Sequence, residues 1–255
     1  MRAMDELLVD KRSGWVRLTL NRPQVRNALS TPLLARIAGS LNDLAADPVC
    51  RAVLIGGADG NFAAGADIGE IELKGSAEAA SDPRKSYWAG IGAFPKPLVV
   101  AVDGFCLGGG FELALMADCL VVGETARLGL PETNLGIMPG AGGTQRLTAL
   151  IGRARALRMV LTGEIIDAVT AEVWGIAGWR VSGSALPEAE ALCANLAGRA
   201  PLALAAAKQA IRAGDESARA FALERANFEA LLDSADKREG IAAFREKRKP
   251  EFKGK

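Results

Sequence analysis

The stretch GFCLGGGFELALMAD, residues 104–118, decides the fold around the candidate site. Three consecutive glycines, Gly108 to Gly110, stand at the start of a predicted helix that runs to about Asp118. Glycine lets a ligand approach the backbone closely, and the first N–H groups of a helix lie unpaired at the positive end of its dipole. That arrangement suits an oxyanion. Tight packing of the helix against a strand explains a triple glycine equally well, so both interpretations stay open.

The glycines do not form a nucleotide-binding motif. Gly108 to Gly110 do not fit GxGxxG, and the second glycine-rich segment, PGAGGT at residues 139–144, lacks the lysine of a Walker phosphate loop. A dinucleotide site or a Walker phosphate loop is therefore unsupported.

Two carboxylates stand close to these glycine-rich segments. Glu112 lies in the first turn of the predicted helix, where the helix dipole favours an acid, but its neighbours are apolar. Partial burial would raise its pKa, as acid–base catalysis requires. Glu132 follows Leu130-Pro131 at a turn, where a solvated loop acid is the simplest interpretation. Two acids and a backbone oxyanion site are what addition of water to a polarised double bond needs.

Histidine is absent from the chain, and Tyr87 is the only tyrosine. The absence of histidine excludes Ser-His-Asp and Cys-His catalysis and zinc bound by histidine. Acid–base chemistry near neutral pH is left mainly to carboxylates, lysine and cysteine.

The charge balance predicts neither a nucleic-acid partner nor a membrane partner. The 255 residues carry 31 basic and 30 acidic side chains, for a formal charge of +1. This balance creates no field that would draw the molecule to nucleic acid or to an anionic membrane. The apolar runs are too short to span a bilayer. The hydrophobic fraction of 49% is typical of a globular chain.

The four cysteines indicate a cytoplasmic protein. Cys50, Cys106, Cys119 and Cys193 include no CxxC pair, so neither a disulfide framework nor a metal knot is expected. The first ten residues lack the apolar region of a signal peptide and the composition of a transit peptide.

Strand and helix signals alternate in the first part of the chain. A helix is predicted after the N-cap Ser30, with an apolar stripe from Leu33 to Leu44. Strands are predicted at residues 15–20, 52–55, 97–102 and 119–123.

The remaining segments divide the chain into two parts. The sequence predicts a lid or a surface excursion at residues 74–84, a loop at residues 128–143, and helix for nearly everything after Thr144. We therefore expect an α/β core at residues 1–190 and a helical region at residues 191–255.

Segments along the whole chain resemble the enoyl-CoA hydratase/isomerase (crotonase) superfamily. They are LTLNRPQVRNAL at 18–29, FAAGADI at 62–68, the 104–118 stretch, LGLPETNLGIMPGAGGTQRL at 128–147, LTGE at 161–164 and EGIAAFREKRK at 239–249. The resemblance implies an α/β, crotonase-like spiral of strand-strand-helix units with a C-terminal helical layer that makes trimers, commonly stacked as hexamers.

The resemblance also assigns site residues. Glu112 and Glu132 would be the catalytic acids, and the N–H groups of Ala66 and Gly109 would bind the thioester oxygen. No metal or redox cofactor is implied, since coenzyme A is part of the substrate. The implied coenzyme A contacts are Arg26, Ala28, Ala64, Asp67 and Ile68, together with Phe244 and Lys247 of a neighbouring subunit.

The expected activity is that of an enoyl-CoA hydratase, a lyase of fatty-acid or phenylacetate breakdown. The alternatives are a Δ3,Δ2-enoyl-CoA isomerase, which can use one carboxylate, and an idle paralogue that binds RNA or a partner. The run PLALAAAKQAI at 201–211 and the end FKGK at 252–255 resemble the bacterial hydratase of phenylacetate breakdown, which acts on dehydroadipyl-CoA.

Two departures and one basic cluster qualify the resemblance. Many hydratases carry lysine where this chain has Gly69, so one phosphate contact is expected to be missing. The usual Gly-Leu-Val reads GIA at residues 175–177, which affects local packing. The cluster Lys247-Arg248-Lys249 has no aromatic platform for RNA beside it, so a solvated tail or a coenzyme A phosphate contact is favoured.

Overall fold

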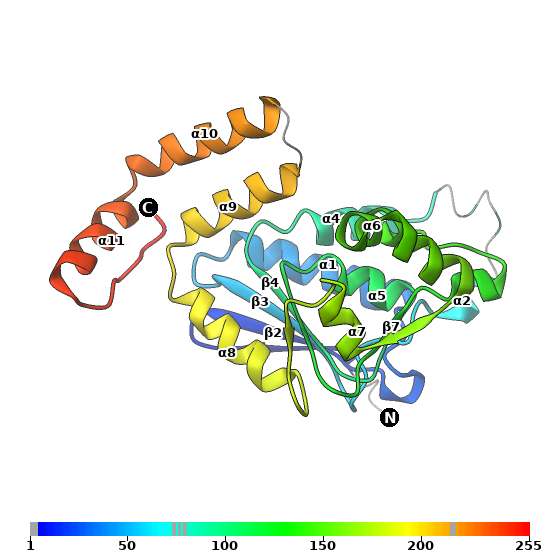
Figure 1. The fold of residues 1–255 in the computed structure, drawn as a ribbon. Coiled ribbons are helices and arrows are strands. Elements are labelled where there is room, and N and C mark those ends of the chain that lie inside the picture. Colours follow the sequence, from blue (N-terminus) through cyan, green and yellow to red (C-terminus); the bar gives the residue numbers. More distant parts are fainter. Residues whose placement is uncertain (1–4, 73–74, 76–77, 79–80, 215–217) are drawn as a thin grey trace.

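The computed structural model describes residues 5–72, 75, 78, 81–214 and 218–255. Its main sheet has a single antiparallel edge, where β1 pairs with β2, and every other neighbouring pair is parallel (Figure 1). The strands lie in the order β1 (Leu7–Lys11), β2 (Trp15–Leu20), β3 (Ala52–Gly57), β4 (Leu98–Val102), β6 (Cys119–Val122) and β9 (Trp179–Arg180).

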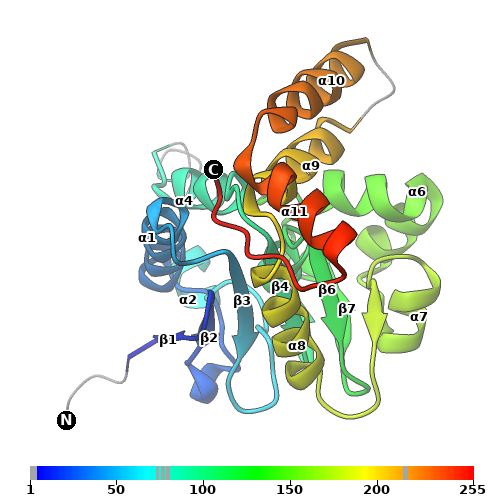
Figure 2. The ribbon, with the colours of Figure 1, turned by 90° about the vertical axis from the view of Figure 1, so that its left-hand side faces the viewer.

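Helices cover both faces of this sheet, as the unbroken apolar strands predict. On β3, Val53 and Ile55 face the core beneath α1 (Thr31–Ala46) and α4 (Arg84–Gly92). Leu54 belongs instead to a second core that is completed by α8 (Leu186–Ala197), which crosses the other face (Figure 2).

A smaller sheet carries the loops that line the candidate site. It consists of β5 (Phe105–Leu107), β7 (Arg127–Gly129) and β8 (Ile165–Asp167), with β5 parallel to β7. Helix α5 (Gly109–Ala114) starts just after β5, and the 3-10 helix η2 (Glu132–Leu135) starts just after β7. Because the parallel strands β5 and β7 end at the same edge of this sheet, Glu112 and Glu132, which follow them, lie near each other.

The remaining helices complete the core and the C-terminal layer. They are η1 (Pro23–Val25), α2 (Ile68–Glu72), α6 (Gly143–Thr162), α7 (Ala168–Val173), α9 (Pro201–Ala213), α10 (Ala218–Leu232) and α11 (Ala235–Glu246). Helices α9 to α11 stand away from the main sheet (Figure 1). Lys208 and Arg212 anchor α9 to the core through Asp118, with N–O distances of 2.6 and 3.0 Å. Among the described helices, none is long and apolar enough to cross a membrane.

Several predicted elements need correction. The helix after the triple glycine ends at Ala114, because the chain turns so that Asp118 can accept the N–H of Leu98 at 2.8 Å. The region after Thr144 is not all helical, since it contains two short strands. Strand β8 belongs to the small sheet and β9 to the main sheet. Strand β1 was also missed, because only its pairing with β2 gives it a partner.

Two other predictions are only partly testable. Within the predicted lid at 74–84, residues 74, 76–77 and 79–80 lie outside the described part of the chain. The division predicted at residue 190 falls inside α8, whose Ala189 and Cys193 pack on the main sheet, and it stays a prediction.

Candidate active site

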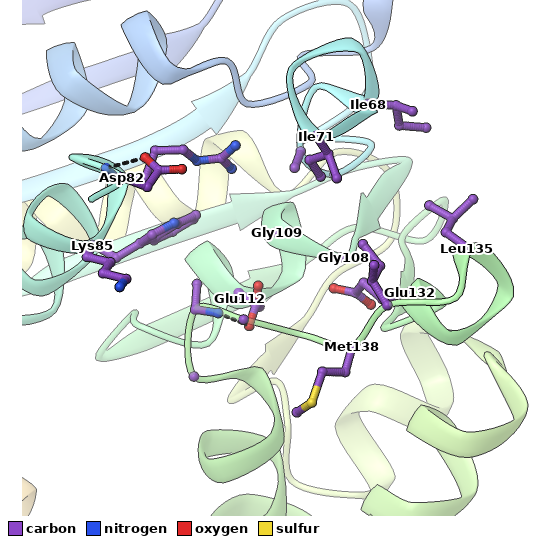
Figure 3. Close-up of a pocket in the computed structure, with 18 of the residues that line it drawn as sticks. Ile68, Ile71, Asp82, Lys85, Gly108, Gly109, Glu112, Glu132, Leu135 and Met138 are labelled. Carbon is purple, nitrogen blue, oxygen red and sulfur yellow. Dashed lines mark hydrogen bonds between the residues drawn. The ribbon is translucent and has the colours of Figure 1, made fainter. Parts of the chain in front are cut away.

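The site is a cavity of about 670 Å³. Its walls come from the 64–66 loop and α2, from α4, from the start of α5, and from the η2 segment with the loop that follows it (Figure 3). Glu112 lies centrally, with the side chains of α4 on one side and Gly108 and Glu132 on the other (Figure 3).

The two predicted oxyanion donors lie next to each other. A Cβ placed on Gly109 would be 3.5 Å from the backbone nitrogen of Ala66. Leu29 bonds the backbone on either side of Ala66, accepting from Asp67 and donating to Gly65 at 3.1 and 2.8 Å, so the Ala66 N–H points away from Leu29. Neither the Ala66 N–H nor the Gly109 N–H donates a hydrogen bond to any described residue.

The three glycines of the triple glycine differ in their surroundings. Gly108 adopts φ 49° and ψ −127°, a conformation that L side chains rarely reach, and lines the cavity with Gly109. Gly110 serves packing, because a Cβ there would lie 2.4 Å from the carbonyl oxygen of Ala63.

Glu112 is a buried carboxylate held in one orientation. Its side chain is 4% exposed, and Oε1 accepts the N–H groups of Ala141 and Gly143 at 2.7 and 2.8 Å. Burial raises the pKa of Glu112, while the hydrogen bonds from the 140–143 loop and the charge of Arg146 oppose part of that rise. Its apolar neighbours left partial burial open, and the structure shows that Glu112 is buried.

Glu132 is not the solvated loop acid that its local sequence suggested. Its Oε2 is buried with no hydrogen-bond partner among the described residues. Burial, aided by the charge of Glu112, raises its pKa to about 7. A Cβ on Gly108 would lie 3.3 Å from Glu132 Oε1, so the carboxylate lies against the triple glycine. Such a group can hold a proton near neutral pH.

The residues predicted to contact coenzyme A are scattered. Ala64 and Ile68 line the cavity. Arg26 lies over the ring of Phe105, 5.0 Å from its centroid. Asp67 and the carbonyl oxygen of Ala28 instead receive hydrogen bonds from Arg22, at 3.0 and 2.6 Å.

Helix α11 carries the other two predicted contacts, outside the cavity of this subunit. Phe244 is 86% exposed, and Lys247 caps the helix end and is also exposed. The neighbouring cation Arg248 is paired with Glu239 at 2.6 Å and with Glu246 at 2.6 Å. This pairing holds the pKa of Glu239 near 2.

Several residues of the cavity wall were not predicted from the sequence. Arg84 and Trp88 lie one helical turn apart on α4, and both line the cavity. That spacing was the available signal. Arg146 also lines it, and its guanidinium donates to the Ala141 carbonyl at 2.8 Å. The described residues contain no cluster of three or more His, Cys, Asp or Glu that could hold a metal ion.

Known proteins resemble this chain in sequence and in fold. The enoyl-CoA hydratase/isomerase family model matches residues 10–255. The chain is 46% identical to the 2,3-dehydroadipyl-CoA hydratase of Escherichia coli, over 99% of this chain and 100% of that relative. It is 41% identical to a probable enoyl-CoA hydratase of Mycobacterium leprae, over 97% and 98% of the two chains. The crystal structure of an enoyl-CoA hydratase from Bacillus anthracis superimposes with a TM-score of 0.92 at 34% identity, covering 98% of this chain and 100% of that one.

Proposed function

We propose that this chain adds water syn across the 2,3 double bond of a trans-2-enoyl-CoA. The premise is that the chain belongs to the enoyl-CoA hydratase/isomerase family and is an enoyl-CoA hydratase. The product is a 3-hydroxyacyl-CoA. One observation carries the proposal: two partly or fully buried carboxylates share a cavity with two unpaired backbone N–H groups.

The N–H groups of Ala66 and Gly109 polarise the thioester carbonyl. As water attacks C3, electrons move from the double bond onto the thioester oxygen, which becomes enolate-like. Donors already aimed at that oxygen need no reorganisation, and one such donor is typically worth ~3 kcal/mol. The contact between the 65–66 and 108–109 segments holds both donors in place.

The two carboxylates divide the proton transfers. Glu112 takes a proton from water as its oxygen bonds to C3, and Glu132 gives a proton to C2. A proton returning from Glu112 to Glu132 through solvent restores the starting state. The raised pKa of Glu132, about 7, supports its assignment as the proton donor. The bonds that hold Glu112 Oε1 keep this carboxylate oriented toward the water.

Crotonyl-CoA tests this function directly. Hydration removes the ultraviolet absorbance of the enoyl thioester, and we expect that loss with the wild-type chain. An isomerase would leave crotonyl-CoA unchanged but create the same absorbance from a 3-enoyl-CoA. An idle paralogue would change neither substrate, and that outcome would refute the proposal.

Coenzyme A would extend from the cavity across Ala64 and Ile68, with Arg26, Ala28 and Asp67 along the same loops. Phe244 and Lys247 would reach it from a neighbouring subunit, which explains why they lie outside their own cavity. We take the assembly to be a trimer or a hexamer. Exposed apolar side chains on α6 and α7 support this assembly; they are Leu150, Leu157, Leu161, Val169 and Val173.

The remaining assignments rest on the sequence and the relatives. The enzyme would act in the cytoplasm, without a metal or redox cofactor and without a nucleic-acid or membrane partner. The proposed role is in fatty-acid or phenylacetate breakdown, and the Escherichia coli relative is named for 2,3-dehydroadipyl-CoA.

A further inference from the structure

The wall that α4 gives to the cavity is charged, although a plain hydrocarbon chain would favour an apolar wall. Arg84 and Lys85 line this side together with Asp82, and Trp88 lies one turn further along the helix. Figure 3 shows Asp82 and Lys85 across Glu112 from Leu135 and Ile68. Since Ile68 is on the proposed coenzyme A side, α4 faces the far end of the acyl chain.

The side chain of Arg84 is mostly buried and makes few polar contacts. Its side chain is only 12% exposed, and its nearest acid, Glu70, lies 3.8 Å away, beyond hydrogen-bond range. Glu70 is already occupied, since its Oε2 accepts the Thr31 N–H at 2.9 Å and the Thr31 hydroxyl at 2.5 Å. Among the described residues, none accepts a hydrogen bond from the Arg84 guanidinium. The guanidinium therefore has one ion-pair contact, to Glu70, and its N–H groups can serve a further acceptor.

Two other charged residues of the cavity wall already have partners. Arg146 donates to the Ala141 carbonyl beside Glu112, so it belongs to the loop that orients that acid. The Asp82 carboxylate accepts the backbone N–H of Arg84 at 2.8 Å, which fixes the first turn of α4. Arg84 is therefore the cavity cation best suited to an incoming anion.

We propose that Arg84 binds the terminal carboxylate of a dicarboxylic enoyl chain, so that the preferred substrates are enoyl-CoA esters with a carboxylate at the end remote from the thioester. A guanidinium matches a carboxylate in planar, two-bond geometry. The exposed Lys85 on the same wall adds positive potential near the entering anion. This inference rests on the proposed hydratase function and deepens it.

Two substrates of equal chain length test the proposal. Trans-2-hexenoyl-CoA and 2,3-dehydroadipyl-CoA both have six acyl carbons and differ at the remote end, methyl against carboxylate. We expect the wild type to prefer the diacid in kcat/KM. Arg84→Met should lower kcat/KM for the diacid by roughly 10- to 100-fold, the range for a hydrogen bond to a charged group. The same variant should leave hexenoyl-CoA unchanged or improved.

Two further variants serve as controls. Arg84→Lys should keep part of the preference for the diacid, because it keeps the charge but loses the two-bond geometry. Arg12→Met removes an exposed arginine that pairs with Asp10 on the far β1 edge, and it should alter neither substrate. If Arg84→Met does not fold, salt supplies the test in the wild type. The ratio of kcat/KM for the diacid to kcat/KM for hexenoyl-CoA should then fall as ionic strength rises, because contacts to coenzyme A are common to both substrates.

Three outcomes would overturn the inference while leaving the hydratase function intact. One is a wild type whose kcat/KM for hexenoyl-CoA equals its kcat/KM for the diacid. Another is an Arg84→Met variant that loses both substrates equally, which would place Arg84 on a part common to both, such as a coenzyme A phosphate. The third is a preference for the diacid that salt does not change in the absence of a folded variant. A wild type that hydrates neither six-carbon substrate nor crotonyl-CoA would instead refute the proposed function.

Discussion

Glu132→Gln should make the protein inactive and, at alkaline pH, more stable. The pKa of Glu132 is raised from 4.5 to about 7 by burial. The folded state therefore binds this proton more tightly than the unfolded state does. Between these two pKa values the unfolded state holds fewer protons, so stability falls as pH rises. The protonated carboxyl is the favoured form in the fold, and glutamine imitates it without ionising.

The size of the effect follows from the shift. About 2.5 pKa units at 1.36 kcal/mol each would give ~3 kcal/mol if the group were sealed from solvent. Glu132 is only partly buried, and solvent screening reduces the expected value to roughly 1–2 kcal/mol. This penalty should be absent below pH 4.5, grow up to pH 7 and stay constant above pH 8.

Urea unfolding of wild type and variant at pH 5, 6, 7 and 8 would measure the effect. The informative quantity is the change with pH of the difference between the two unfolding free energies, because the cost of placing an amide in the site does not vary with pH. Hydration of crotonyl-CoA should fall at least ~100-fold in the variant. A stability difference that is flat from pH 5 to 8 would show that Glu132 ionises normally, and our account of the proton donor would be wrong.

Three further predictions concern the rest of the site and the tail. Glu112→Gln should fold and bind CoA esters but lose hydration at least ~100-fold, and full activity in this variant would remove Glu112 from the mechanism. Gly109→Val should abolish turnover with little change in the unfolding midpoint, because its Cβ meets Ala66 at an ordinary 3.5 Å while the branched methyls crowd the oxyanion site. Gly110→Ala is the matched control and should lose ~1–3 kcal/mol of stability, since its Cβ would lie 2.4 Å from a carbonyl oxygen. Equal losses of stability in the two variants would mean that Gly109, like Gly110, serves packing alone. Lys247→Ala should raise KM for the CoA ester at low salt with kcat nearly unchanged. Deletion of residues 241–255 should also loosen the assembly, as measured by sedimentation. An unchanged KM and an intact assembly in both variants would assign the tail to solvent.

Much of the fold was accessible from local patterns. The alternation of residues 15–20 and the continuous apolar run at Leu98–Val102 predicted strands that the structure contains. Ser30 caps α1 through the Leu33 N–H at 3.2 Å, as its sequence position suggested. These features are local, because hydrophobic period, capping and burial act over a few residues. The apolar neighbours of Glu112 made partial burial of this acid one of two possibilities.

The sequence by itself determined several of the helices and strands, but tertiary structure decided what meets in the cavity. Glu132 looked like a loop acid until the pairing of β5 with β7 placed it beside Gly108. The direction of the Ala66 N–H depends on a bridge to Leu29, and Arg84 lies at the cavity 3.8 Å from Glu70, whose carboxylate is bonded to Thr31. Each of these facts joins residues more than ten positions apart, and local propensity cannot specify such contacts, because they form only when the chain closes on itself.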